Sequence, residues 1–100
     1  MSDRPVRFTA TSREHVAREH AWWLENRHYR QTFETELEKA IDILAVLPGA
    51  GTPYTRAGIP GLRRLYVRRL GCHVYYTFDD HEVIVRAFWG ARRERGPAFL

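Results

Sequence analysis

The chain has 100 residues, of which 44% are hydrophobic and 28% charged, and its formal net charge is +4. This length and composition predict a single domain over residues 1–100 and exclude wholesale disorder. The lone cysteine, Cys72, excludes an internal disulfide, and the sequence has neither an apolar leader nor a run of ~20 apolar residues that would cross a membrane. We therefore expect a cytoplasmic protein that does not associate with membranes.

Positive charge is concentrated in the last part of the chain. Residues 1–60 carry 8 basic and 8 acidic side chains, whereas residues 61–100 carry 8 basic and 4 acidic ones. Every basic residue except Lys39 is an arginine, whose planar guanidinium binds phosphates and carboxylates. This pattern predicts an anionic partner, either nucleic acid or an acidic protein segment, and the alternative is a basic surface that is merely solvated.

The sequence begins with an expected strand and an expected helix. Val6–Ala10 alternates apolar and polar residues, which is typical of a strand. Thr11 and Glu14 have the spacing of a capping box, which predicts a helix from there to about Asn26. Residues at helical spacing form the apolar stripe of this helix: Val16, Ala17, Ala21, Trp23 and Leu24.

Two aromatic residues of this helix need a separate interpretation. His20 lies in the apolar stripe, and we interpret it as a structural residue. Trp22 lies off the stripe, about 100° from Trp23 and on the same side as His15 and Glu19. Exposed tryptophans are uncommon and aromatic residues are enriched at interfaces. Trp22 therefore either packs against a neighbouring loop or contacts a partner protein.

A second helix is expected over about Gln31–Leu47, with apolar residues along one side and acidic residues along the other. The polar link between the helices, residues 26–30, is short enough for an antiparallel hairpin. Pro48 ends the second helix, and a loop rich in proline and glycine continues to Gly61.

Gly61–Arg95 contains three strand-like runs, separated at Leu70-Gly71 and at Asp79-Asp80. Because successive strand residues alternate between faces, the first two runs present one apolar and one polar face. The apolar face, expected beneath the helices, comprises Leu65, Val67, Val74, Tyr76 and Phe78. The polar face comprises Arg64, Tyr66, Arg68, His73 and Tyr75. The third run is apolar at nearly every position, as in a strand covered on both faces. The whole pattern predicts an α+β fold consisting of an N-terminal strand, an antiparallel two-helix hairpin and a three-stranded antiparallel meander.

The spacing of the ligating and nucleophilic residues argues against a metal or cofactor site. Cys72 and His73 are neighbours on a strand and point to opposite faces, and His81 is the only other member of that cluster. Cys72 shares the core face with Val74, where a thiol behaves as a small hydrophobic group. The glycines of the loop lack the sequence context of a phosphate-binding loop. We therefore expect no cofactor.

The polar face is the candidate site, and three arginines follow its last strand: Arg92, Arg93 and Arg95. Arginines and aromatic rings on one sheet face suit the binding of a phosphate backbone and the stacking of bases. With His73 as a proton carrier, the same group would also suit metal-free RNA cleavage, in which cations stabilise the crowded phosphate. Both possibilities, binding and catalysis, follow from the pattern.

The chain resembles the ParE/RelE superfamily of toxins of type II toxin–antitoxin systems over about Pro5 to Phe99. The resemblance rests on the order strand–helix–helix–three strands and on several short segments. These are the Leu47–Pro53 loop, Gly61–Leu65, Val74–Tyr76 with Asp79-Asp80, and the ending Val85–Arg93.

The resemblance implies a toxin that is silenced by a cognate antitoxin, with which it oligomerises, and a role such as plasmid stabilization. The antitoxin of such a toxin lies across the sheet and the helix hairpin, and we expect it to contact Trp22 and Tyr75. ParE-like members poison DNA gyrase, whereas RelE-like members cut mRNA on the ribosome without a metal. The RelE-like catalytic pattern falls on Arg64, His73 and Arg93 of this sequence.

Other positions depart from that RelE-like pattern. Tyr66 occupies a lysine position, Trp89 stands where many relatives have histidine, and Phe99 replaces a tyrosine and has no hydroxyl group. These departures put nuclease activity in doubt, and the Pro/Gly loop and the Trp89–Arg93 ending look nearer to the ParE-like branch.

Gyrase inhibition is therefore the favoured function. A RelE-like ribosome-dependent mRNA interferase is the first alternative, and a non-toxic basic nucleic-acid-binding module is the second. The residues expected to bind the target are Arg64, Tyr66, Arg68, Arg92, Arg93 and Arg95. Because Arg93 follows the last strand, we expect Arg93→Ala to abolish toxicity and to leave the fold intact.

Overall fold

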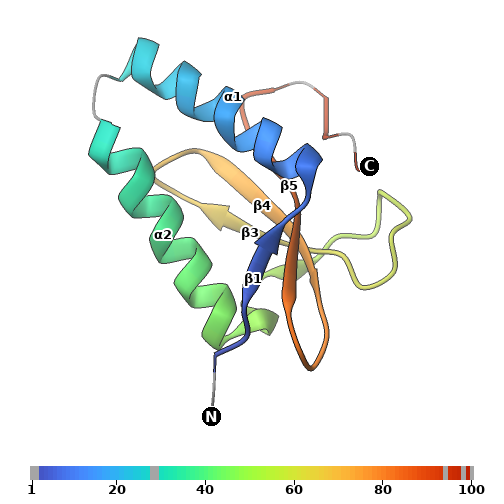
Figure 1. Cartoon of the computed structure of the whole chain (residues 1–100). Coiled ribbons are helices and arrows are strands. Elements are labelled where there is room, and N and C mark those ends of the chain that lie inside the picture. The colour runs from blue at the N-terminus through green and yellow to red at the C-terminus, as the bar shows by residue number, and fades with distance from the viewer. Residues whose placement is uncertain (1–2, 28–29, 94, 98, 100) are drawn as a thin grey trace.

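The computed structural model describes residues 3–27, 30–93, 95–97 and 99 (Figure 1). The elements follow the predicted order and confirm the α+β fold, and residues 28 and 29 of the predicted link lie outside the described part. The elements are β1 (Val6–Phe8), α1 (Ala10–Asn26), α2 (Arg30–Val46), the 3-10 helix η1 (Pro48–Ala50), β2 (Thr52–Pro53), β3 (Arg63–Val67), β4 (Cys72–Phe78) and β5 (Val83–Gly90).

The strands of the described part form one five-stranded sheet in the order β1-β5-β4-β3-β2. The last three strands in sequence, β3, β4 and β5, pair as the predicted antiparallel meander. At one edge β1 runs parallel to β5, with Val6 opposite Val83, so the sheet is mixed. At the other edge the two residues of β2 pair with β3, in a segment predicted to be irregular.

Helix α1 begins two residues earlier than the capping box at Thr11 predicted. Its N-cap is Thr9, whose hydroxyl oxygen accepts a hydrogen bond from the backbone N–H of Ser12 at 3.1 Å. The helix buries Ser12, His15, Glu19 and Trp23. These residues are three or four positions apart and form one face, but only Trp23 belongs to the predicted apolar stripe. Val16 of the predicted stripe also packs against the core, so the stripe is right in part, although most of the fully buried residues of this helix are polar.

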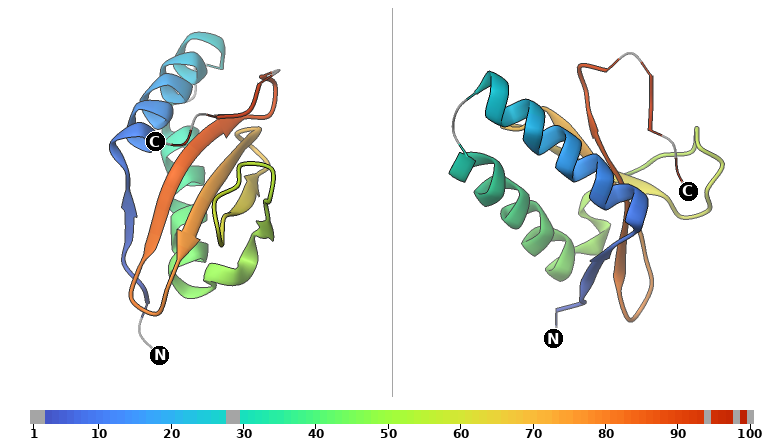
Figure 2. Two further views of the ribbon diagram at one scale, coloured as in Figure 1. Left: turned by 90° about the vertical axis from the view of Figure 1, so that its right-hand side faces the viewer. Right: turned by 45° about the horizontal axis from the view of Figure 1, so that its top comes forward.

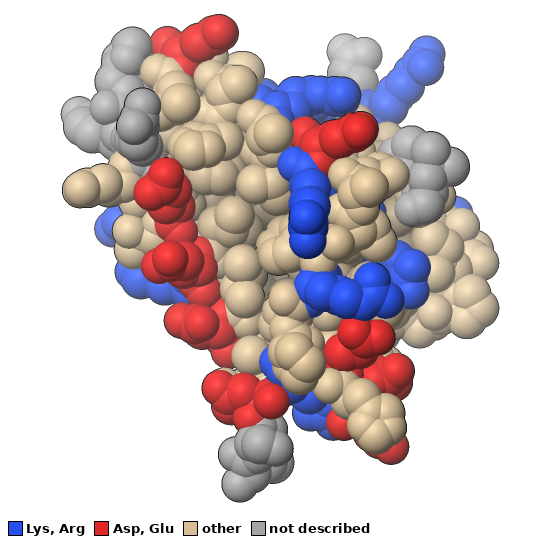
Figure 3. Space-filling view, in the orientation of Figure 1, with Lys and Arg blue, Asp and Glu red and all other residues tan. Residues whose placement is uncertain are grey.

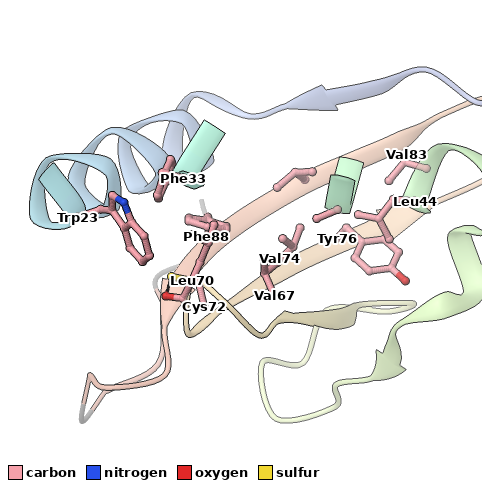
Figure 4. Packing of buried hydrophobic residues seen from close by; sticks show 12 residues of the cluster. Trp23, Phe33, Leu44, Val67, Leu70, Cys72, Val74, Tyr76, Val83 and Phe88 are labelled. Carbon is pink, nitrogen blue, oxygen red and sulfur yellow. Dashed lines mark hydrogen bonds between the residues drawn. The ribbon is translucent and has the colours of Figure 1, made fainter. Parts of the chain in front are cut away.

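Both helices lie on the same side of the sheet and cover its apolar face (Figures 1 and 2). The core between them contains Trp23 of α1, Phe33 and Leu44 of α2, and Tyr76 and Phe88 of the sheet (Figure 4). The ring of Phe33 meets that of Phe88 edge-on at 6.0 Å, and His20 stacks on Phe33 at 4.6 Å. This position agrees with the structural role predicted for His20. Phe78, expected in this core, is 39% exposed at the end of β4.

An irregularity in the β4–β5 pairing changes which residues of β5 face the helices. Tyr75 pairs with Ala87 and Tyr76 pairs with Val85, so Arg86 is an extra residue on β5. Such a bulge reverses the alternation of faces along the strand. Val85 therefore packs in the core under the helices, whereas Ala87 packs on the opposite face.

The opposite face of the sheet is partly covered by the loop after β2 (Figure 2). Leu62, Tyr75 and Ala87 are buried there, and Tyr54 and Phe99 pack against them. The sequence pattern predicted a polar face here and did not indicate that its central part is covered. Tyr66, in contrast, is 51% exposed. Within the described ranges, no helix has the length and apolar character needed to cross a membrane.

Candidate functional site

A hollow on the sheet face away from the helices brings together several of the predicted site residues. It has a volume of about 200 Å³. Strand pairing places His73 of β4 between Tyr66 of β3 and Trp89 of β5. We call this cavity the sheet hollow, and the lining residues used below are Tyr54, Arg64, His73, Tyr75, Trp89, Arg93 and Arg95.

His73 is partly buried in the sheet hollow among aromatic rings and beside an arginine. Its ring lies 4.9 Å from that of Tyr66 and 6.0 Å from that of Tyr75. Burial, and secondarily the positive charge of Arg64, lower the pKa of His73 below its usual value. The imidazole is therefore neutral near pH 7 and has the protonation state of a base.

Aromatic contacts close one side of the sheet hollow. The guanidinium carbon of Arg64 lies 5.0 Å from the ring centre of Tyr54. Tyr54 and Phe99 both meet the ring of Tyr75 edge-on, at 5.1 Å and 5.3 Å. Tyr75 is only 4% exposed, so the expectation of an open tyrosine is not met. A partner would reach its ring only after Tyr54 or Phe99 had moved.

Trp89 connects the sheet hollow to helix α1. Its ring N–H donates to the backbone oxygen of Arg95. The guanidinium carbon of Arg93 lies 4.5 Å from the ring centre of Trp89, and the ring of His15 meets Trp89 edge-on at 4.9 Å. His15 accepts the backbone N–H of Phe88 at Nδ1, at 3.3 Å, and burial together with the nearby charge of Arg18 lowers its pKa.

The carboxylate of Glu19 holds two of the predicted target-binding arginines. It accepts a hydrogen bond from Nη1 of Arg92 at 2.7 Å and from Nε of Arg93 at 2.9 Å. Glu19 is 2% exposed, so solvent does little to stabilise its charge. The two guanidiniums stabilise it instead. Arg93 therefore makes a structural contact, although its position after the last strand led to the expectation that Arg93→Ala leaves the fold intact.

A second cavity, of about 360 Å³, lies between the end of α1 and the β3–β4 turn. Arg92 lies over the indole ring of Trp22 at 4.0 Å, and Arg27 lies over the same ring at 5.5 Å. We call this cavity the tryptophan groove, and its principal lining residues are Trp22, Trp23, Arg27, Tyr66, Arg68, Arg69 and Arg92.

The predicted target-binding residues are distributed between the two cavities. Arg64, Arg93 and Arg95 line the sheet hollow, and Arg68 and Arg92 line the tryptophan groove. Tyr66 lines the groove and contacts His73 of the hollow. Trp22, expected to bind the antitoxin, thus lies in the same groove as two arginines expected to bind the target.

Two buried residues of helix α1 that contact the site, His15 and Glu19, were not predicted from the sequence. Both were placed on the polar side of the helix, yet both are buried. The signal that could have indicated them is their spacing, because Ser12, His15, Glu19 and Trp23 follow one another at intervals of three or four residues.

The thiol of Cys72 is buried beneath this region, as its strand position predicted. Its sulfur lies 3.9 Å from Oε1 of Glu19 and 3.4 Å from the backbone oxygen of Leu70. Burial, and then the negative charge of Glu19, raise the pKa of Cys72 to about 12, so the thiol remains protonated. Nowhere in the described ranges do three or more potential metal ligands come together.

Acidic side chains are kept apart from these cavities on helix α2. Figure 3 shows them as a stripe down one side of the molecule, over α2. The exposed residues Glu34, Glu38 and Asp42 are four positions apart and form such a row. The protein therefore has an acidic helix surface and, elsewhere, two arginine-lined cavities.

Comparisons with known proteins agree with this architecture. A family model described as "ParE toxin of type II toxin-antitoxin system, parDE" matches residues 6–95. Among solved structures, a chain of the chromosomal ParDE TA system from P. aeruginosa is similar with a TM-score of 0.71 and 12% sequence identity, covering 87% of this chain and 95% of that chain. At this identity the structural likeness shows the fold alone. No curated protein matches the chain in sequence. The family model covers nearly the whole chain, and the chain therefore belongs to the ParE family of toxins of type II toxin–antitoxin systems, whose partner is an antitoxin.

Proposed function

We propose that this toxin inhibits DNA gyrase in the cytoplasm and that a cognate antitoxin neutralises it. The chain belongs to the ParE family. This membership supports the proposal, because the resemblance described above implies gyrase poisoning for ParE-like members and mRNA cleavage for RelE-like ones. The proposal also agrees with the composition of the sheet hollow, where arginines and rings are plentiful and His73 is the remaining candidate for proton transfer.

The observation that carries the proposal is the packing of Phe99 against Tyr75, which lines the sheet hollow. RNA cleavage by attack of the 2′-hydroxyl requires a base and an acid close to the phosphate. Phe99 occupies the position of a RelE-like tyrosine and packs edge-on against Tyr75, so it offers no proton. Trp89 at the histidine position donates its ring N–H to the backbone of Arg95, and an indole does not exchange protons near neutral pH.

One observation favours the alternative, a RelE-like mRNA interferase. His73 is neutral near pH 7 and lies in the hollow with Arg64, so a base and a cation for the phosphate are both present. In that case the catalytic residues would be Arg64, His73 and Arg93. Loss of one polar catalytic group commonly costs ~2–4 kcal/mol of transition-state stabilisation, which is the reason that gyrase remains the preferred target.

We propose that the target and the antitoxin use neighbouring surfaces. Arg64, Arg93 and Arg95 of the hollow, with Arg68 and Arg92 of the groove, would bind anionic groups of the target. Trp22 would contact the antitoxin, and an antitoxin bound there would cover two of these arginines. Neutralisation would then follow from direct occlusion, and complexes of toxin and antitoxin would be oligomeric.

Two assays on the purified toxin separate these functions. In the first, gyrase supercoils a relaxed plasmid, and we expect the toxin to inhibit supercoiling and to increase cleaved DNA. In the second, primer extension on mRNA from translating ribosomes should show no new cuts. Cuts that appear with the toxin and disappear with His73→Asn, together with normal supercoiling, would establish the interferase instead.

A further inference from the structure

Glu19 is a buried carboxylate that links the middle of α1 to the segment after β5. Its two oxygens bind different arginines, Arg92 at Oε1 and Arg93 at Oε2. The thiol of Cys72 lies 3.9 Å from Oε1 as a third donor. A buried carboxylate is stable only where its charge is paired and its oxygens accept hydrogen bonds, and Glu19 meets both conditions.

The two arginines point from this carboxylate into different cavities. Arg92 lies over Trp22 at 4.0 Å and lines the tryptophan groove, whereas Arg93 lies over Trp89 at 4.5 Å and lines the sheet hollow. Each guanidinium is thus held by a carboxylate at its edge and by an indole at its face. A guanidinium has five N–H donors, and within the described residues each of these two gives one nitrogen to Glu19. Donors remain to bind a phosphate or a carboxylate of a target.

Gly90 makes room for this arrangement at the end of β5. A Cβ atom at this position would overlap Nη1 of Arg92 and would lie 3.3 Å from Oε1 of Glu19. The nitrogen is the end of a flexible side chain, but Glu19 and Trp22 fix it in place. A side chain at position 90 would therefore push Arg92 away from the groove.

We propose that Glu19 is a positioning residue, which fixes Arg92 in the tryptophan groove and Arg93 in the sheet hollow so that both arginines face the toxin's target. The inference rests on the proposed function only in assuming that these arginines contact the target. Glu19 itself, 2% exposed, does not touch it.

The test is the variant Glu19→Gln, which keeps the shape of the side chain. The amide oxygen can accept from one guanidinium, but the amide nitrogen is a donor and faces the other. We expect expression of this variant without antitoxin to leave at least tenfold more colony-forming cells than expression of the wild type. The matched control is Glu14→Gln, an exposed glutamate of the same helix, which should remain as toxic as the wild type.

An NMR measurement distinguishes a variant that no longer positions the arginines from a variant that no longer folds. In the wild type, the Nε–H of Arg93 is bonded to a buried carboxylate, and its NMR signal should be protected from exchange with water. Glu19→Gln should lose the protected signal of whichever bonded nitrogen, Nε of Arg93 or Nη1 of Arg92, faces the amide nitrogen, while the backbone amide spectrum stays dispersed. A Glu19→Gln variant that is folded and as toxic as the wild type would overturn the inference.

If Glu19→Gln does not fold, Gly90→Ala decides the question, because it displaces Arg92 and keeps the carboxylate. Toxicity reduced at least tenfold in a folded Gly90→Ala protein supports the positioning role, and full toxicity overturns it. The colony count does not depend on which target the toxin has. A toxin that arrests growth without affecting gyrase would therefore contradict the proposed function and still test the role of Glu19.

Discussion

The hydroxyl group of Tyr76 provides a stability test that can be worked out from the structure. Tyr76 is 0% exposed, and its hydroxyl donates to the backbone oxygen of Pro48 at 2.7 Å and accepts the backbone N–H of Gly51 at 2.9 Å. Tyr76→Phe removes both hydrogen bonds. It leaves the buried backbone oxygen of Pro48 and the buried backbone N–H of Gly51 without the hydroxyl group as their partner. Each such group costs ~1–3 kcal/mol, so we expect the free energy of unfolding to fall by about 2–6 kcal/mol.

This change is large for a domain of this length. Each kcal/mol shifts the midpoint of thermal unfolding by ~4–8 °C, so the midpoint should fall by roughly 10–50 °C. Thermal and urea unfolding followed by circular dichroism measure both quantities. The control is Tyr66→Phe, since Tyr66 is 51% exposed and surface substitutions usually change stability by less than ~0.5 kcal/mol.

The effect should also be local. Arg63 donates to the backbone oxygen of Gly51, at 2.7 Å from Nη2, and the loop that follows carries Tyr54 to the ring of Tyr75. Hydrogen exchange at Gly51 should therefore become faster in Tyr76→Phe. If Tyr76→Phe and Tyr66→Phe have the same stability, the reasoning about buried backbone groups is refuted.

Three further predictions concern the site. Cys72, with a pKa of about 12 and 2% exposure, should resist alkylation at pH 8 and react only when urea unfolds the protein, and rapid labelling of the folded protein would contradict its position. The pKa of His73 is lowered in the folded state, so below about pH 6.5 the unfolded chain binds more protons and stability should fall on acidification. An NMR titration should show a higher pKa for His73 in Arg64→Ala, and an unchanged pKa would exclude the proposed influence of that charge. Trp22→Ala should weaken antitoxin binding more than it lowers stability, and calorimetry showing equal binding would count against a contact at Trp22.

The fold could be predicted from the sequence where the apolar residues of an alternating strand are also the residues that are buried under the helices. The alternation in β3 and β4 placed Val67 and Val74 under the helices and His73 on the other face, as the structure shows. It could not indicate that Tyr75 is buried on that other face, because the cover comes from Tyr54 and Phe99, which are distant in sequence.

Helix α1 shows why the candidate site was predicted only in part. A search for an apolar stripe counts hydrophobic residues, and on this helix Glu19 and His15 take buried positions instead. Their burial depends on partners from the far end of the chain, namely Arg92, Arg93 and the backbone of Phe88. Nothing in the local sequence of the helix indicates such partners, since a buried charge is stable only in the assembled protein.

The position of β5 in the sheet has a consequence for biosynthesis. This strand lies between β1 and β4, so the first and the last strands to leave the ribosome are neighbours. Until residues 83–90 have been made and released, β1 lacks the strand beside it, and the arginines that follow β5 do not yet exist. A nascent or truncated chain therefore contains neither arginine-lined cavity. If the arginines of these cavities bind the target, as proposed, a chain that lacks residues 83–95 should not be toxic.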